Sequence, residues 1–173
     1  MNRCLAIVIL LSASVASAEE PVKKLSVGDR APAFKIKDSR GKTVDLAELT
    51  AKGPVLLRLT CGCAGCDKEI GYFQKIHEAY KEQGLTSLFV FKEPDAKVAK
   101  YAQEKKLDML YAVDSEGESW KTFQTKTMPT NFLIEKGGKI VSIIAGCDPS
   151  GLLADRVSQK AAKVVGTGAV RVK

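Results

Sequence analysis

Histidine and tryptophan are scarce in this sequence of 173 residues, which contains one residue of each, His77 and Trp120. His77 lies in the middle of a helical pattern and on its apolar side, which indicates a core position rather than a metal ligand. Metal centres built on several histidines are therefore excluded. Internal repeats and linkers long enough to divide the chain are also absent, so we expect one domain, with Trp120 contributing to its packing.

Long hydrophobic runs are absent as well, because the apolar stretch Cys4–Val15 is too short to cross a bilayer comfortably. It follows Asn2-Arg3, a short positive segment, and precedes the small residues Ala16-Ser17-Ala18, which is the pattern of a secretory signal peptide. We predict a signal peptide over residues 1–18 that is cleaved after Ala18. The mature protein is then expected in the periplasm or secreted, without stable membrane insertion, and Cys4 is lost with the signal.

The chain carries 27 basic and 20 acidic residues, a formal net charge of +7, but the lysines are scattered rather than clustered with aromatic residues. This distribution favours a solvated basic surface and argues against nucleic acid as a partner. The hydrophobic content of 45% is that of an ordinary globular protein.

Four cysteines remain after signal cleavage: Cys61, Cys63, Cys66 and Cys147. The pair Cys63-x-x-Cys66 follows the apolar run 54–59, which is typical of a buried strand, and opens a helical pattern over 66–84. The unpaired N–H groups at the start of a helix stabilise a thiolate. We therefore predict that Cys63 is the exposed, attacking thiol and that Cys66 is the buried, resolving thiol. A purely structural disulfide between them is the alternative.

The remaining pattern alternates strands and helices and then closes with a hairpin and a helix. A first hairpin is expected around the turn 38–41. The other expected strands span 85–91, 109–113, 131–135 and 140–145, and the other expected helices span 45–50, 94–106, 115–124 and 149–165. This order predicts an α/β sandwich with a mixed central sheet, preceded by a flexible leader over 19–26 and followed by a frayed tail over 166–173.

Three motifs in this arrangement resemble the thioredoxin superfamily, and most closely the exported TlpA/ResA-type thiol-disulfide oxidoreductases of the wider redoxin (AhpC/TSA) group. They are the V-L-L-R-L strand leading into C-A-G-C-D-K-E, the D-S-E-G turn at 114–117, and M-P-T-N-F-L-I followed by G-G-K-I at 128–140. The resemblance implies a thioredoxin-like domain over 27–165, built as a three-layer sandwich in which helices flank the sheet and an N-terminal hairpin is added. It also implies that Pro129 is cis and lies against the dithiol, while the backbone of Met128 binds the substrate.

For function, the resemblance implies an enzyme that carries out thiol–disulfide exchange with exported partner proteins. A membrane electron donor is then expected to supply its electrons. Its only redox group is then the Cys63–Cys66 disulfide, with no separate cofactor. Known roles in the family include reduction of apocytochrome thiols, in cytochrome c maturation, and of copper-site thiols. The pair Ala64-Gly65 between the cysteines has no hydrogen-bonding side chain, which favours a reductant over an oxidant.

The sequence departs from the family at several points. Gly62 stands where a tryptophan is usual, the loop is about one residue shorter, and Gly71 replaces a helix proline. Cys61 is an additional cysteine, either a second redox thiol or a bystander. The fold implied by the resemblance brings the A-G-C-D-P loop to the same edge, where Cys147 is a small buried residue, an accessory thiol or a partner of Cys61 in a disulfide.

Two other functions remain open on the sequence. Thr60-x-x-Cys63 imitates part of a peroxiredoxin motif, although Leu56 occupies its proline position. The second alternative function is a metal carrier, because Cys61, Cys63, Cys66 and Cys147 form a soft thiolate set suited to Cu(I) or Zn(II). Related copper carriers use C-x-x-x-C and a later histidine, which this sequence does not match, so no metal site is expected.

Overall fold

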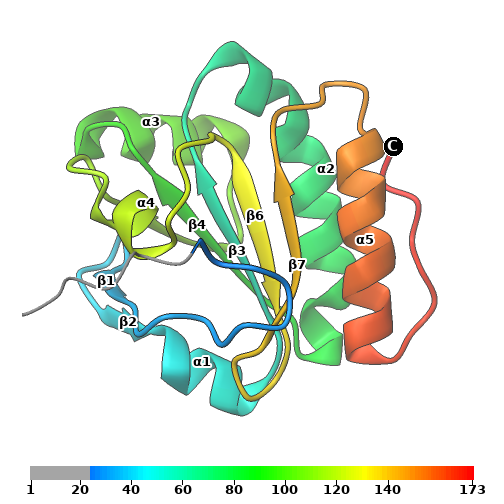
Figure 1. Ribbon diagram of the computed structural model, residues 1–173. Coiled ribbons are helices and arrows are strands. Elements are labelled where there is room, and N and C mark those ends of the chain that lie inside the picture. Colours follow the sequence, from blue (N-terminus) through cyan, green and yellow to red (C-terminus); the bar gives the residue numbers. More distant parts are fainter. Residues whose placement is uncertain (1–23) are drawn as a thin grey trace, which may run out of the picture.

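A five-stranded sheet forms the centre of the computed structural model, which describes residues 24–173 (Figure 1). Across the sheet the strands lie in the order β5 (Leu110–Val113), β4 (Thr86–Phe91), β3 (Val55–Thr60), β6 (Thr130–Ile134) and β7 (Ile140–Ala145). Strands β3, β4 and β5 are parallel, whereas β6 is antiparallel to both β3 and β7. The predicted mixed sheet is confirmed.

The central position of β3 explains its nearly continuous apolar sequence. Every residue of this strand is buried, because helices or loops cover both faces of the sheet. Leu57 and Leu59 face one hydrophobic cluster, while Leu56 faces the other. Arg58 is the exception in this strand, since it is a charged residue with only 1% of its surface exposed.

Helices and a hairpin complete the three layers (Figure 1). Helices α2 (Ala64–Tyr80), α3 (Asp95–Lys105) and α5 (Leu152–Val165) contribute buried side chains to the cluster on one face of the sheet. The cluster on the other face is formed with the hairpin β1 (Lys35–Lys37) and β2 (Thr43–Asp45), helix α1 (Leu46–Lys52) and the short helix α4 (Glu118–Thr122). The predicted thioredoxin-like sandwich with an N-terminal hairpin is therefore confirmed.

Local backbone conformation shifts two helix boundaries from their predicted positions. Helix α2 begins at Ala64, two residues early, because Cys63 is extended and already acts as its N-cap residue. A short 3₁₀ helix, η1 (Lys81–Gln83), follows α2 and ends at Gly84. Helix α5 begins at Leu152 rather than near Pro149, because Gly151 before it has a φ of 84°.

The C-terminal residues do not fray, which corrects the expectation for 166–173. The side chain of Val172 is fully buried, and its backbone N–H donates to the Asp155 carboxylate over 2.8 Å. Lys75 of α2 donates to the Val172 carbonyl oxygen over 3.0 Å, and the Val170 N–H donates to the Tyr80 hydroxyl over 2.9 Å. The sequence pattern missed this contact because a single valine in a polar tail has no periodicity.

The described residues 24–173 include no helix that is both long and apolar enough to cross a membrane. The predicted signal peptide, residues 1–18, and residues 19–23 of the predicted leader lie outside the described part of the chain.

Candidate active site

Three loops converge at the end of the sheet where β3 stops. Residues 61–63 connect β3 to α2, and the Met128–Pro129 peptide bond, which is cis as expected, immediately precedes β6. Because Leu59 pairs with Thr130, the start of β6 lies beside the end of β3. The loop after β7 joins them, since the N–H of Gly146 donates to the Pro129 carbonyl oxygen over 2.9 Å. The structure thus brings the C-x-x-C segment, the cis-proline loop and the Cys147 loop to one edge.

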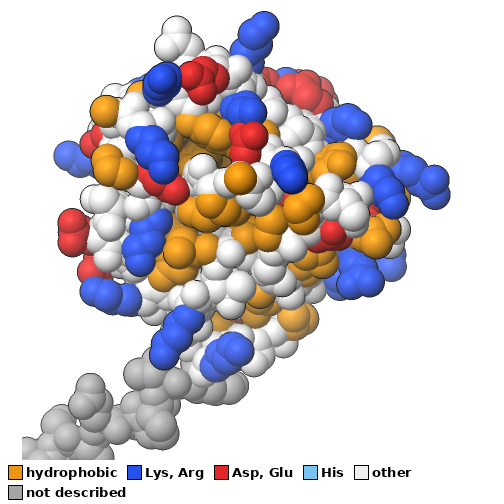
Figure 2. Space-filling view, turned by 90° about the horizontal axis from the view of Figure 1, so that it is seen from above, with side chains coloured by type: hydrophobic (Ala, Val, Ile, Leu, Met, Phe, Trp, Pro, Cys, Tyr) orange, Lys and Arg blue, Asp and Glu red, His pale blue; other side chains and the backbone are white. Residues whose placement is uncertain are grey.

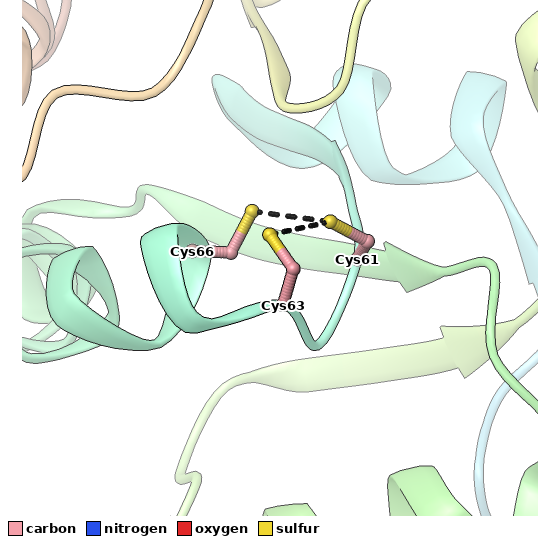
Figure 3. Close-up of side chains that lie close together, drawn as sticks. All are labelled: Cys61, Cys63 and Cys66. Atoms are coloured by element: carbon pink, nitrogen blue, oxygen red, sulfur yellow. Dashed lines mark hydrogen bonds between the residues drawn. The ribbon is translucent and has the colours of Figure 1, made fainter.

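Cys63 and Cys66 have the exposure predicted for an attacking and a resolving thiol. Cys63 is the N-cap residue of α2 (Figure 3). Its side chain is exposed, whereas Cys66 is only 3% exposed. The backbone N–H of Cys66, followed by the thiol of Cys61, lowers the pKa of Cys63 from 9.0 to about 7. The helix start therefore supports a substantial thiolate population at neutral pH.

Cys61 is an integral member of the same thiol cluster. Its thiol donates to the Cys63 sulfur at 3.0 Å, and its sulfur lies 3.4 Å from that of Cys66 (Figure 3). Burial, together with the hydrogen bond to Cys63, raises the pKa of Cys61 to about 12. At neutral pH Cys61 is thus a protonated hydrogen-bond donor to the Cys63 thiolate. The sequence could not distinguish this position from that of a bystander.

Cys147 lies beside the cluster and is exposed, so its interpretation as a small buried residue is wrong. Its sulfur packs against Gly65, where an added Cβ atom would approach it to 2.8 Å. Partial burial of the thiol and the nearby carboxylate of Glu69 raise the pKa of Cys147 to about 11. Cys61 is a free thiol directed at Cys63 and Cys66, so the structure does not pair it with Cys147.

A buried ion pair, which no motif in the sequence indicates, supports the cluster. Arg58 of β3 donates to Glu69 of α2 over 2.8 Å, and the side chains of both residues are 1% exposed. The guanidinium also donates to Asn131 over 2.9 Å and lies 3.9 Å from the centre of the Phe73 ring. The second Glu69 oxygen accepts from the N–H of Asp148 over 2.9 Å. The pair therefore ties β3, α2, β6 and the Cys147 loop together.

The loop after β4 holds the other side of the cysteine segment. The N–H of Gly62 donates to a carboxylate oxygen of Glu93 over 2.5 Å, and the N–H of Lys92 donates to the Thr60 carbonyl oxygen over 3.2 Å. Glu93 was not singled out from the sequence, because a single glutamate in a loop carries no periodic or motif signal. These contacts fix the backbone on which Cys61 and Cys63 are displayed.

A groove of about 830 Å³ extends beside the cis-proline loop. Met128, with 39% of its surface exposed, lies on this groove, which Trp120 and Lys121 also line. Trp120 is 6% exposed and packs in the core, as expected. Seen from above, this end of the molecule shows hydrophobic side chains gathered at its centre and basic side chains around them (Figure 2). Of the two predicted substrate-binding residues, Met128 therefore lines an apolar, accessible groove, and Pro129 is its neighbour in the chain.

His77 is remote from the thiols, in agreement with its predicted place in the fold. It follows Cys66 by eleven positions in α2, which corresponds to about 16 Å along the helix. Burial lowers the pKa of His77, which lies 3.8 Å from Asp108. Lys81 forms ion pairs with both neighbouring acids, at 2.9 Å from Asp108 and 3.0 Å from Glu78. The acids around His77 are therefore neutralised by a lysine.

Comparison with known proteins identifies the family of the chain. Residues 27–143 match the AhpC/TSA family. The thiol-disulfide oxidoreductase ResA of Bacillus thuringiensis subsp. konkukian is 33% identical over 125 residues, which cover 72% of each chain.

Solved structures show the same fold. The crystal structure of a putative thiol:disulfide interchange protein DsbE from Chlorobium tepidum superposes with a TM-score of 0.75 at 24% identity, covering 83% of this chain and all of the other. The peroxidoxin BcpB from Mycobacterium tuberculosis gives a TM-score of 0.67 at 25% identity, covering 81% of this chain and 96% of the other. The chain therefore belongs to the AhpC/TSA family of the thioredoxin superfamily and, within it, to the ResA-like thiol-disulfide oxidoreductases.

Proposed function

We propose that this protein is exported and reduces disulfides of exported partner proteins, with Cys63 as the nucleophile and Cys66 as the resolving thiol. The observation that carries the proposal is the contrast between these two sulfurs. Cys63 is exposed at a helix N-terminus with a pKa of about 7, and Cys66 is buried one turn later. The export rests on the signal-like pattern of residues 1–18.

The reaction is two successive thiol–disulfide exchanges. The Cys63 thiolate attacks one sulfur of the partner disulfide, forms a mixed disulfide and releases the other partner sulfur as a thiolate. Cys66 then loses its proton and attacks the Cys63 sulfur, which forms the internal disulfide and releases the second partner thiol. Two electrons pass to the partner, and a dithiol donor at the membrane restores the reduced enzyme.

The environment of Cys63 supports a reductant. The thiolate of Cys63 is stabilised mainly by a backbone N–H and by Cys61, which places its pKa near 7. Strong oxidants of this fold stabilise their thiolate much further, to a pKa of about 3.5, whereas the reductant thioredoxin has a value of about 7. A weakly stabilised reduced form gives up its electrons more readily.

The groove beside Met128 and Pro129 is the proposed binding surface for the partner segment. Its position at the edge shared with the thiols lets an extended segment pair with the Met128 backbone while its disulfide faces Cys63. A peroxidase is less well supported. The Thr60 hydroxyl donates to the Cys61 carbonyl oxygen over 3.3 Å, and Arg58 is buried against Glu69, so neither is available to bind a peroxide at Cys63.

The test is disulfide-reductase turnover with insulin as the substrate and a chemical dithiol as the donor. Cys63→Ser is expected to abolish turnover, and Cys66→Ser is expected to accumulate mixed disulfides visible by non-reducing mass spectrometry. Cys147→Ser is the matched control and should retain turnover. Full turnover by Cys63→Ser would show that the nucleophile is assigned wrongly. Mass spectrometry of the exported protein should give an N-terminus at Glu19, and an intact residue 1–18 segment would contradict the predicted cleavage.

A further inference from the structure

The thiols of Cys61, Cys63 and Cys66 are arranged as three converging ligands (Figure 3). All three sulfur atoms lie within 4.8 Å of one another, and Cys61 is 3.0 Å from Cys63 and 3.4 Å from Cys66. With metal–sulfur bonds of about 2.3 Å, the sulfurs of a planar three-coordinate site are about 4 Å apart. Small side-chain rotations therefore suffice to place a metal ion between the three sulfurs.

The donor set selects the kind of ion. The cluster consists of three sulfurs, and among residues 24–173 no imidazole or carboxylate joins it within the same distance. Thiolate ligands suit both Cu(I) and Zn(II), but structural zinc sites are almost always four-coordinate, whereas three sulfurs satisfy Cu(I). We propose that the reduced cluster of Cys61, Cys63 and Cys66 binds one Cu(I) ion. This binding goes beyond the proposed reductase function and does not depend on it.

The surroundings of the cluster favour a bound ion. The cluster lies at the start of α2, where the unpaired N–H groups of a helix N-terminus offset part of the negative charge that remains when three thiolates hold a monovalent cation. Cys63 is exposed, which gives the ion a path from solvent. Cys61 and Cys63 lie on a segment whose backbone is held by Glu93, so two of the three ligands are positioned before the ion binds.

Cys147 is excluded from the site by its position. Its sulfur packs against Gly65 beside the helix and is not a member of the three-sulfur group. This geometry revises the four-cysteine metal set considered from the sequence. It also makes Cys147→Ser a matched control for Cys61→Ser, because each substitution removes one thiol near the site and only one removes a ligand.

Copper binding and disulfide exchange must be mutually exclusive. A disulfide between Cys63 and Cys66 removes two of the three donors, so protein oxidised with excess oxidised glutathione cannot hold the ion. Conversely, bound Cu(I) occupies the nucleophile and should protect Cys63 from alkylation. The same thiols therefore either exchange disulfides or hold Cu(I).

The experiment is an anaerobic titration of the reduced full chain with Cu(I) in competition with bicinchoninate. Wild type is expected to retain one Cu(I) per chain, with a sulfur-to-copper charge-transfer band in the near ultraviolet. Cys61→Ser should weaken Cu(I) binding by at least about tenfold, because it removes a direct ligand. Cys147→Ser should match wild type, and oxidised wild type should bind none.

Four results would overturn the proposal. They are absence of Cu(I) from reduced wild type, equal affinity in Cys61→Ser, equal losses in Cys61→Ser and Cys147→Ser, or Zn(II) displacing Cu(I) at equal concentration. Far-ultraviolet circular dichroism establishes that each variant is folded. Because insulin reduction is measured separately on metal-free protein, failure of copper binding leaves the reductase function standing, and failure of turnover leaves the copper site standing.

Discussion

The reactivity of Cys63 should saturate just above neutral pH, and removal of Cys61 should shift that dependence upward. With a pKa of about 7, half of the Cys63 thiols are thiolates at pH 7. By the same relation about a tenth are thiolates at pH 6 and nearly all at pH 9. The alkylation rate should therefore rise about fivefold from pH 6 to 7 and less than about twofold from pH 7 to 9.

The Cys61 variants separate the causes of this low pKa. The Cys61 thiol donates to Cys63 at 3.0 Å, but the N–H of Cys66 is the larger influence on its pKa. Cys61→Ala removes the side-chain donor, so the pKa of Cys63 should rise yet stay below 9.0, the value without these contacts. Cys61→Ser keeps a hydroxyl donor and should therefore raise the pKa of Cys63 less than Cys61→Ala does.

The assay is the rate of iodoacetamide labelling of the Cys63 peptide between pH 5.5 and 10, read by mass spectrometry, with thiolate absorbance as a second readout. Cys147 provides an internal comparison, because its pKa of about 11 should keep its labelling rate rising throughout this range. Labelling of Cys63 that continues to rise about tenfold per pH unit up to pH 9 would refute the reasoning. So would a Cys61→Ala profile identical to that of wild type.

Three predictions concern stability and are measured by urea denaturation. Arg58→Met leaves the buried Glu69 without its partner and should lower the free energy of unfolding by about 3–5 kcal/mol. Adding Glu69→Leu should recover much of this loss. A loss below about 1 kcal/mol for Arg58→Met would contradict the buried ion pair. Deletion of residues 167–173 removes the buried Val172 and should lower the free energy of unfolding by about 2–4 kcal/mol. An unchanged urea midpoint would instead support a tail that makes no stable contacts. Gly65→Ala should lower the free energy of unfolding by about 1–3 kcal/mol, because the added methyl group contacts the Cys147 sulfur. The loss should be smaller when Cys147→Ala is also present. An equal loss with and without Cys147→Ala would show that Cys147 does not contact Gly65.

Much of the fold was predictable because its signals are local. The apolar run of β3 and the stripe of α5 mark buried elements through periodicity alone. Spacing likewise made Cys63 and Cys66 the candidate dithiol, because a C-x-x-C pair at a strand-to-helix junction places its first thiol beside the N–H groups that begin the helix. The cis peptide at Pro129 followed from the motif resemblance rather than from periodicity.

The contacts that the sequence did not reveal are those made across the fold. Arg58 and Glu69 are 11 positions apart, and their pairing depends on how α2 packs on β3. Glu93, which lies in a separate loop, accepts a hydrogen bond from Gly62, and Val172 is buried in the hydrophobic cluster that includes side chains of α2 and α5. Cys61 was visible as an extra cysteine, but its direction toward Cys63 and Cys66 depends on the conformation of a three-residue loop. Such contacts produce no periodic pattern of residue types in the sequence.

A glutathione redox titration shows whether Cys63 and Cys66 form one redox couple. Thiols are alkylated at each potential, and the linkages are identified by peptide mass spectrometry. We expect a single two-electron transition that joins Cys63 to Cys66 while Cys61 and Cys147 remain alkylatable. A transition that joins Cys61 to Cys147, or one that leaves Cys63 alkylatable at every potential, would contradict it.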